Sequence, residues 1–419
     1  MSHVPGYSSA RPFPTHQQAV SSPYGTPSHP LTPKPRRRGL LGAFALMWVP
    51  GLAIGAFAIF GEHVTAPDPD VALQSGIGFA HYDGTDLALV PYDRNGSGGL
   101  IASIRHDVFE VRIAAVDLAT GDTAWDVQLS DALAWKTAVV AAGEHYAYLA
   151  SDDGLMILDL ADGDTVTEAG EVPGLEGSQS VSGAAYGFDP ALGAVVALDV
   201  DGGVHTIALD ALEATPADAD TTATWSGMLF PEGPVPDIGG MTSTEALLAD
   251  GEATVRIAPL ADNALGGGLV LDGPEGERAL GTRVFYGAGI VLDQTALVSQ
   301  FTVEIDVDEL IEEFMEGAAA AGQDLWTGTG TTAAGAASGH VLVEHQPEPA
   351  VEAYALHVVD LATGQVTASI DTGSRLGRAL TGPTGHTVVI AAPEGSYWLG
   401  DLVIVAPEGS IERVEIGRD

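Results

Sequence analysis

The sequence predicts an all-β domain that follows one membrane-spanning helix, and three observations support this prediction. Short runs rich in β-branched residues alternate with turn residues through most of the chain after residue 75, which is typical of an all-β protein. A unit of strand, turn and strand recurs at intervals of about 40 residues. Residues 39–61 form an uncharged apolar run close to the N-terminus.

Residues 1–38 differ from the rest of the chain in charge and composition. Five of the 16 basic residues lie in this segment, and no Asp or Glu precedes Glu62. The segment is rich in Pro, Ser, His and Gln and has no apolar periodicity. We therefore expect a disordered, basic, Pro-rich tail.

The run from Gly39 to Gly61 predicts a transmembrane helix that contacts membrane lipid. Its 23 residues match a hydrocarbon core of roughly 30 Å at about 1.5 Å per residue. Three arginines at 36–38 precede the run and acidic residues follow it, so the positive-inside rule places the tail in the cytoplasm and the large domain outside. The segment 56–58 also fits the cleavage site of a signal peptide, which is the alternative interpretation.

The chain after residue 61 is strongly acidic. It holds 11 basic and 57 acidic residues, a net formal charge of −46, which excludes a general nucleic-acid binder. The sequence contains no cysteine, so disulfides, cysteine-ligated metals and a cysteine nucleophile are excluded. We expect residues 62–75 to form an acidic stalk and residues 76–419 to form one domain outside the membrane.

Four segments of this domain align with one another: 112–125, 155–166, 195–207 and 357–370. Their anchoring acids are Asp117, Asp159, Asp199 and Asp360, and the first three are 42 and 40 residues apart. Weaker echoes lie at Asp250, Asp293 and near residue 406. This periodicity is typical of a β-propeller, and seven anchors predict seven blades, with eight as the near alternative.

The turn in each unit has a physical explanation. An Asp at the first position can accept a backbone N–H two residues on. Gly121, Gly163 or Gly364 then supplies the positive φ that reverses the chain.

One unit carries a more specific pattern, A-x-D-x-x-T-G-x-x-x-W, at residues 115–125. It contains Asp117, Thr120, Gly121 and Trp125, and Asp360, Thr363 and Gly364 repeat its turn without the Trp. The pattern resembles the repeat of pyrroloquinoline-quinone-type (quinoprotein-like) β-propellers, and the whole chain resembles a group of membrane-anchored actinobacterial proteins with such an exterior domain. The resemblance implies that Trp125 packs between neighbouring blades.

An insertion at residues 306–339 interrupts the repeat. Residues 306–316 predict a short amphipathic helix, with an apolar stripe that includes Leu310 and Phe314 and acids opposite it. A low-complexity run follows as far as Gly339. The helix either caps the domain or forms a lid that docks a partner.

No catalytic constellation is found in the sequence, and no cofactor is expected. The nucleophile elbow, P-loop, dinucleotide fingerprint and H-E-x-x-H motif are all absent. Asp159, Asp162 and Asp164 are weak candidates for a cation site, as are Asp218 and Asp220.

The histidines after the tail are scattered along the chain. His340 and His345 are five residues apart and are expected on opposite faces of a strand, which does not suit a shared metal ion. We expect these imidazoles to be exposed or to have hydrogen-bond partners.

Two classes of function remain. The first is a membrane-anchored extracytoplasmic propeller that acts as a protein-interaction or scaffolding module for an unknown envelope protein. The alternative is a ligand sensor or an enzyme whose site lies at the central channel of the propeller.

Overall fold

The computed structural model describes residues 69–95, 109–132, 135–230, 242–249, 251–261, 263–295, 332–349, 351–393 and 399–417. The chain divides into two units, residues 1–59 and 60–419, and all described residues belong to the second. The predicted tail, transmembrane run and amphipathic helix 306–316 lie outside the described ranges. Within those ranges, no helix is long and apolar enough to cross a membrane.

The first sheet contains the N-terminal strands of the domain. Its strands are β1 (Asp70–Leu73), β2 (Gly78–Tyr82), β3 (Thr85–Asn95), β4 (Phe109–Asp117) and β5 (Thr123–Ser130). All pairings are antiparallel, and β1 and β2 both pair with β3. The domain therefore starts before residue 76 and the acidic stalk does not extend to residue 75, because Val71 and Leu73 are buried in the core.

The second and third sheets have four strands each. The second contains β6 (Thr137–Ala142), β7 (Tyr146–Ser151), β8 (Gly154–Asp159) and β9 (Thr165–Thr167). The third contains β10 (Tyr186–Asp189), β11 (Ala194–Leu198), β12 (Val204–Ala208) and β13 (Thr215–Pro216). The short helices η1 (Gly183–Ala185) and α4 (Ala219–Trp225) flank the third sheet in sequence.

The fourth sheet has eight strands. They are β14 (Thr242–Ser243), β15 (Glu245–Leu247), β16 (Thr254–Leu260), β17 (Asn263–Gly273), β18 (Gly276–Val291), β19 (His340–Gln346), β20 (Tyr354–Asp360) and β21 (Val366–Thr372). The helix η2 (Ala336–Ser338) precedes β19. Strand β18 pairs with β17 as far as Tyr286 and with β19 from Tyr286 onward, with a register shift between Tyr286 and Gly289. One strand therefore joins two units of the sheet.

The fifth sheet contains β22 (Ala379–Thr381), β23 (Thr387–Ala391), β24 (Asp401–Val405) and β25 (Ile411–Glu415).

The five sheets form six blades, which are numbered along the chain, because the eight-stranded sheet contributes two of them. Blade 1 is β1–β5, blade 2 is β6–β9 and blade 3 is β10–β13. Blade 4 is β15–β17 with the first part of β18, blade 5 is β14, the last part of β18 and β19–β21, and blade 6 is β22–β25.

At five joints, neighbouring blades pack face to face through apolar side chains. On β4, Ile113 and Ala115 pack against blade 2, whereas Ala114 and Val116 pack against blade 6. This alternation follows from the two-residue period of a strand, which is why nearly every position of the middle strands is apolar. Similar cores join blades 2 and 3, 4 and 5, and 5 and 6.

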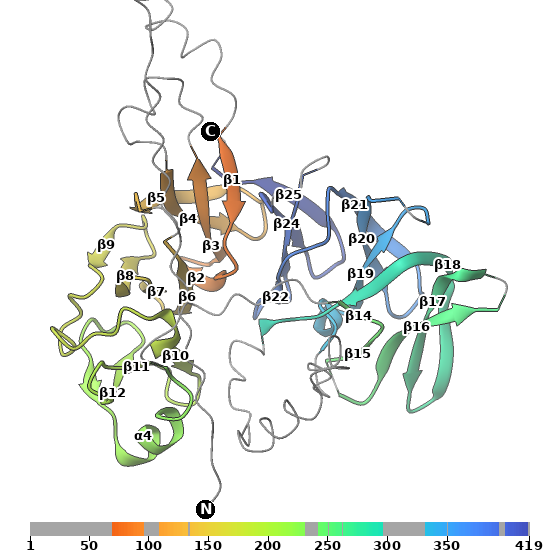
Figure 1. Cartoon of the computed structure of the whole chain (residues 1–419). Coiled ribbons are helices and arrows are strands. Elements are labelled where there is room, and N and C mark those ends of the chain that lie inside the picture. The colour runs from red at the N-terminus through yellow and green to blue at the C-terminus, as the bar shows by residue number, and fades with distance from the viewer. Residues whose placement is uncertain are drawn as a thin grey trace, which may run out of the picture. The chain divides into compact units, whose positions relative to one another are not determined.

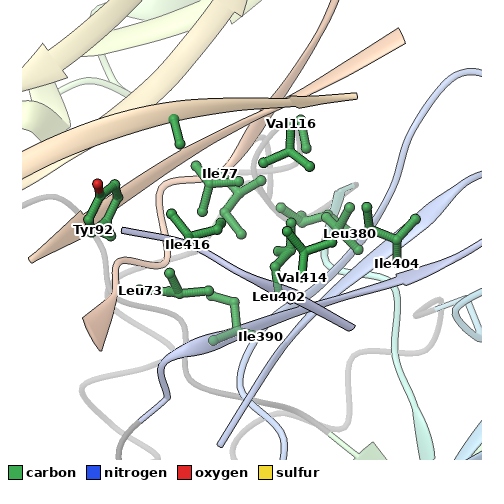
Figure 2. Close-up of a cluster of buried hydrophobic side chains, with 14 of the residues drawn as sticks. Leu73, Ile77, Tyr92, Val116, Leu380, Ile390, Leu402, Ile404, Val414 and Ile416 are labelled. Atoms are coloured by element: carbon green, nitrogen blue, oxygen red, sulfur yellow. The ribbon is translucent and has the colours of Figure 1, made fainter. Parts of the chain in front are cut away.

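The last blade packs against the first. Figure 2 shows Leu73, Ile77 and Val116 of blade 1 among Leu402 and Ile416 from the C-terminal part of the chain. In Figure 1 the first sheet, in orange, lies beside the last sheet, in dark blue. Antiparallel sheets that pack largely in chain order, with the last against the first, are typical of a β-propeller.

The predicted count of seven blades, with eight as the alternative, is not confirmed, because the described strands form six units. Asp250 lies outside the described residues. Asp293 is not in a hairpin; its Oδ1 atom accepts hydrogen bonds from the backbone N–H groups of Thr295 and Thr381 at 2.9 and 3.2 Å. A conspicuous Asp after an apolar strand therefore does not always mark a blade.

Candidate functional site

The Asp-led hairpins have the turn geometry expected from the sequence. Asp117 Oδ1 accepts the backbone N–H of Ala119 at 2.7 Å, and Asp159 Oδ1 accepts that of Ala161 at 2.9 Å. The following glycines have φ values of 71° at Gly121, 80° at Gly163 and 69° at Gly364. L-residues rarely adopt this conformation, which is why glycine stands there.

These glycines also allow each turn to approach the preceding blade closely. A Cβ atom on Gly163 would lie 2.6 Å from the ring of Trp125 in blade 1, and one on Gly121 would lie 2.8 Å from the Glu412 carboxylate in blade 6. A Cβ on Gly364 would lie 2.3 Å from the backbone nitrogen of Gly281 in blade 4. The turn therefore serves both chain reversal and packing between blades.

The Trp125 side chain lies where the resemblance implies, between two blades. It is half-buried, and its indole Nε1–H donates a 2.8 Å hydrogen bond to the carbonyl of Leu160 in blade 2. In blade 5, Thr367 takes part in the equivalent contact, because its hydroxyl donates to the carbonyl of Gly409 in blade 6 at 3.1 Å.

The contacts place four hairpins in a continuous row. Thr367 of blade 5 meets the blade 6 turn, Glu412 of blade 6 meets the blade 1 turn, and Trp125 of blade 1 meets the blade 2 turn. We call this row the acidic turn face. Its carboxylates are Asp117, Asp122, Asp159, Asp162, Asp164, Asp360, Glu408 and Glu412.

A cavity of about 460 Å³ opens in this face between blades 6 and 1. Its apolar wall comes from Leu118, Ile404 and Ile411. Its polar lining comes from His386, Glu408, Ser410 and Glu412. An apolar wall with carboxylates beside it suits a side chain that is apolar along its stem and cationic at its end, as Arg and Lys are.

Hydrogen bonds keep carboxylates of this face charged. The backbone N–H of Glu408 lowers the pKa of its own carboxyl group, and the Ser410 hydroxyl, which donates to Glu408 Oε1 at 2.9 Å, lowers it further. The Thr363 hydroxyl, which donates to Asp360 Oδ1 at 2.7 Å, lowers the pKa of Asp360, and the Thr363 backbone N–H acts in the same direction. Both groups are therefore negative at neutral pH.

The weak cation candidates act in turns and caps. Asp159 and Asp162 each accept a backbone N–H within their hairpin, from Ala161 and Asp164. Asp218 caps α4 by accepting the N–H of Thr221 at 2.8 Å. Within the described part of the chain, no group of three or more His, Asp or Glu side chains is arranged to hold a metal ion.

Asp199 lies in the hairpin of blade 3 and, besides backbone N–H groups, has a histidine side chain as a partner. Its Oδ2 atom lies 2.9 Å from Nε2 of His205, and its Oδ1 atom accepts the N–H of Gly203 at 2.6 Å. Desolvation raises the pKa of Asp199, but these donors outweigh it and the pKa is lowered.

Two histidines depart from the sequence-based expectation. His345 and His357 are buried and stack on each other with ring centroids 4.3 Å apart, and neither ring nitrogen of His357 has a hydrogen-bond partner among the described residues. Sequence spacing could not show this pair, because it depends on the register in which Val343 of β19 faces His357 of β20.

No family model matches the chain, and neither does any curated protein. Solved structures with some similarity include a calcium-binding protein, regucalcin, from Agrobacterium tumefaciens, with 16% identity, coverage of 78% of this chain and 87% of that one, and a TM-score of 0.25. BamB from Moraxella catarrhalis has 13% identity, coverage of 84% of each chain and a TM-score of 0.20. A puromycin-hydrolyzing peptidase of Mycobacterium tuberculosis has 13% identity, coverage of 83% of this chain and 53% of that one, and a TM-score of 0.29. At such scores and identities these similarities carry no conclusion about the site, which depends on the geometry above.

Proposed function

We propose that this chain is an interaction module whose acidic turn face binds a basic segment of a partner protein. The observation that supports the proposal most is the row of four hairpins, whose carboxylates surround a cavity with an apolar wall. Such a surface offers several anionic contacts to an extended segment and one recess for an Arg or Lys side chain.

The net charge of the whole chain also supports binding of a basic partner. With 57 acidic and 16 basic residues, the protein attracts cationic partners at long range and repels anionic ones. Complementary charge speeds encounter and favours cationic partners over others. The recess beside Glu408 and Glu412 adds one defined position for an Arg or Lys side chain.

The second part of the proposal concerns location. The uncharged run 39–61, preceded by Arg36, Arg37 and Arg38, supports a single-pass anchor with the tail in the cytoplasm and the propeller outside. The partner is then an envelope protein, and the acidic surface keeps the module away from anionic lipid.

The test uses the full-length protein and a fluorescent oligoarginine peptide as the probe, with anisotropy as the readout. Replacing both Glu408 and Glu412 by Gln should weaken binding about fivefold. The matched control is the double variant Asp131→Asn and Glu348→Gln, because both residues are exposed and lie at the opposite ends of β5 and β20 from the hairpins.

Binding by the control should stay within about twofold of the wild-type value. Equal losses in both double variants would show that general acidity, and not the turn face, binds the probe. An oligoarginine affinity no higher than that of an uncharged peptide would exclude a basic partner.

A further inference from the structure

The joint between blades 4 and 5 contains two buried imidazoles that are not part of the acidic turn face. His345 on β19 and His357 on β20 are each 4% exposed and stack at 26° between ring planes. Phe285 on β18 lies edge-on to both rings, with centroids 5.3 and 6.1 Å away. The rings continue the apolar core that joins the two blades.

The hydrogen bonds of the pair suit neutral rings. His345 Nδ1 lies 2.8 Å from the carbonyl of Gln346 and so carries the proton, which leaves Nε2 as a bare acceptor with no partner among the described residues. Both nitrogens of His357 also lack a partner among those residues. A proton added to either ring would place an N–H⁺ where no described residue offers an acceptor, which is costly in an apolar core.

The charged groups around the pair shift imidazole pKa values in opposite directions. Arg283 on β18 disfavours a positive charge on both rings, whereas Asp371 on β21 favours one on His345. Burial is the largest effect, and it lowers the pKa of His345 and lowers that of His357 to about 3.

The pair lies where β18 passes from one blade to the next. Phe285 directly precedes the register shift between Tyr286 and Gly289, and Gly287 there has φ of 52°. Near this end of the joint, Phe285 and the imidazoles pack beside the pairing of Tyr286 with Gln346. At the hairpin end, the Arg278 guanidinium donates a 2.6 Å hydrogen bond to the Leu361 carbonyl. A change at the imidazoles therefore acts where a single strand links two blades.

We propose that His345 and His357 form an acid-sensitive joint, in which protonation of the pair separates β18 of blade 4 from β19 and β20 of blade 5. We expect the event to be local, because both rings lie beside the core that joins blades 4 and 5. This inference does not depend on the proposed binding function.

The test is hydrogen exchange of the full-length protein between pH 7.5 and pH 5, corrected for the intrinsic pH dependence of exchange. Peptides that cover 280–290 and 340–346 should lose protection on acidification by tenfold or more. In the opened state an imidazole regains its ordinary pKa of about 6.5 and binds a proton at pH 5, and each pKa unit between the two states shifts the opening equilibrium about tenfold. His357→Phe removes one titrating ring without breaking a hydrogen bond between described residues, and its loss should be several-fold smaller than that of the wild type, because only His345 of the pair remains. The control His81→Gln changes a ring whose side chain is 66% exposed and should behave as the wild type does.

An equal loss of protection in wild type and His357→Phe would overturn the proposal, as would a loss spread evenly over all blades. If His357→Phe does not fold, exchange at the C2 position of each histidine in the wild-type protein decides the matter. The proposal then requires His345 and His357 to titrate below the ordinary imidazole pKa of about 6.5, and ordinary titration of both would exclude it.

Discussion

The indole Nε1–H of Trp125 donates a 2.8 Å hydrogen bond to the carbonyl of Leu160, and so links the outer strand of blade 1 to the hairpin of blade 2. The ring also lies so close to Gly163 that a residue with a Cβ atom at position 163 would clash with it. This contact joins the sequence repeat to the packing of the blades.

Trp125→Ala should lower the free energy of unfolding by about 3 kcal/mol, because it removes an aromatic contact between blades together with a hydrogen bond. Trp125→Phe keeps most of the apolar contact and should cost about 1 kcal/mol. Chemical denaturation of both variants measures these values. An unchanged midpoint for Trp125→Ala would show that the contact does not stabilise the fold.

Asp210 should be a strong link between blades 2 and 3. Its carboxylate accepts the backbone N–H groups of Glu144, His145 and Tyr146 at 2.9, 2.7 and 3.3 Å, and its own φ is 64°. Asp210→Ala should cost about 2–3 kcal/mol, whereas Asp210→Asn keeps an acceptor, tolerates the positive φ and should cost less. Thermal melts of the two variants rank them, and the reverse order would contradict this account.

Asp210 also predicts an acid dependence of stability. Desolvation raises the pKa of this carboxyl group, but the three backbone donors outweigh it and the pKa is lowered. The stability it contributes is therefore present above the unfolded pKa of about 4 and is lost as the pH falls below it. Melts of wild type and Asp210→Asn from pH 6 to pH 3 should converge at the acid end.

Glu344 predicts the opposite dependence of stability on pH. It is 3% exposed, and burial raises its pKa to about 7 despite the nearby Arg375 and the backbone N–H of Leu376. The folded state is therefore favoured below the unfolded pKa of about 4.3 and loses that stability as the pH rises through about 7. Glu344→Gln should be roughly 2–3 kcal/mol more stable than wild type at pH 8 and similar at pH 4.5. A gain that does not change with pH would contradict this explanation.

The proposed anchor predicts a single insertion with the tail inside. Protease added to intact cells should digest the chain after residue 62 and spare an epitope placed before residue 38. An N-terminal tag and the propeller should migrate as one band, whereas separate bands would favour the cleaved signal peptide.

Local physics explains which features the sequence could predict. The hairpins at Asp117, Asp159 and Asp360 depend on a side-chain acceptor and a glycine a few residues away, so the sequence contains their whole cause. The row that these hairpins form could not be predicted, because it depends on contacts such as that of Gly121 with Glu412, nearly 300 residues apart along the sequence.

The blade count stays unconfirmed and the histidine pair could not be predicted, for a similar reason. Strand β18 runs without a break from blade 4 into blade 5, so no turn marks the boundary between them. His345 and His357 meet only through the pairing of β19 with β20, which a one-residue shift in register would abolish.

The most direct test of the central claim maps where a basic segment binds. An oligoarginine peptide with a photoreactive group should be cross-linked to the full-length protein and the adducts located by mass spectrometry. We predict adducts in the hairpins at 117–122, 159–164, 360–365 and 406–412, and their loss when Glu408 and Glu412 are both replaced by Gln. Adducts concentrated near Asp131 and Glu348, or unchanged by the double substitution, would contradict the assignment of the acidic turn face as the binding surface.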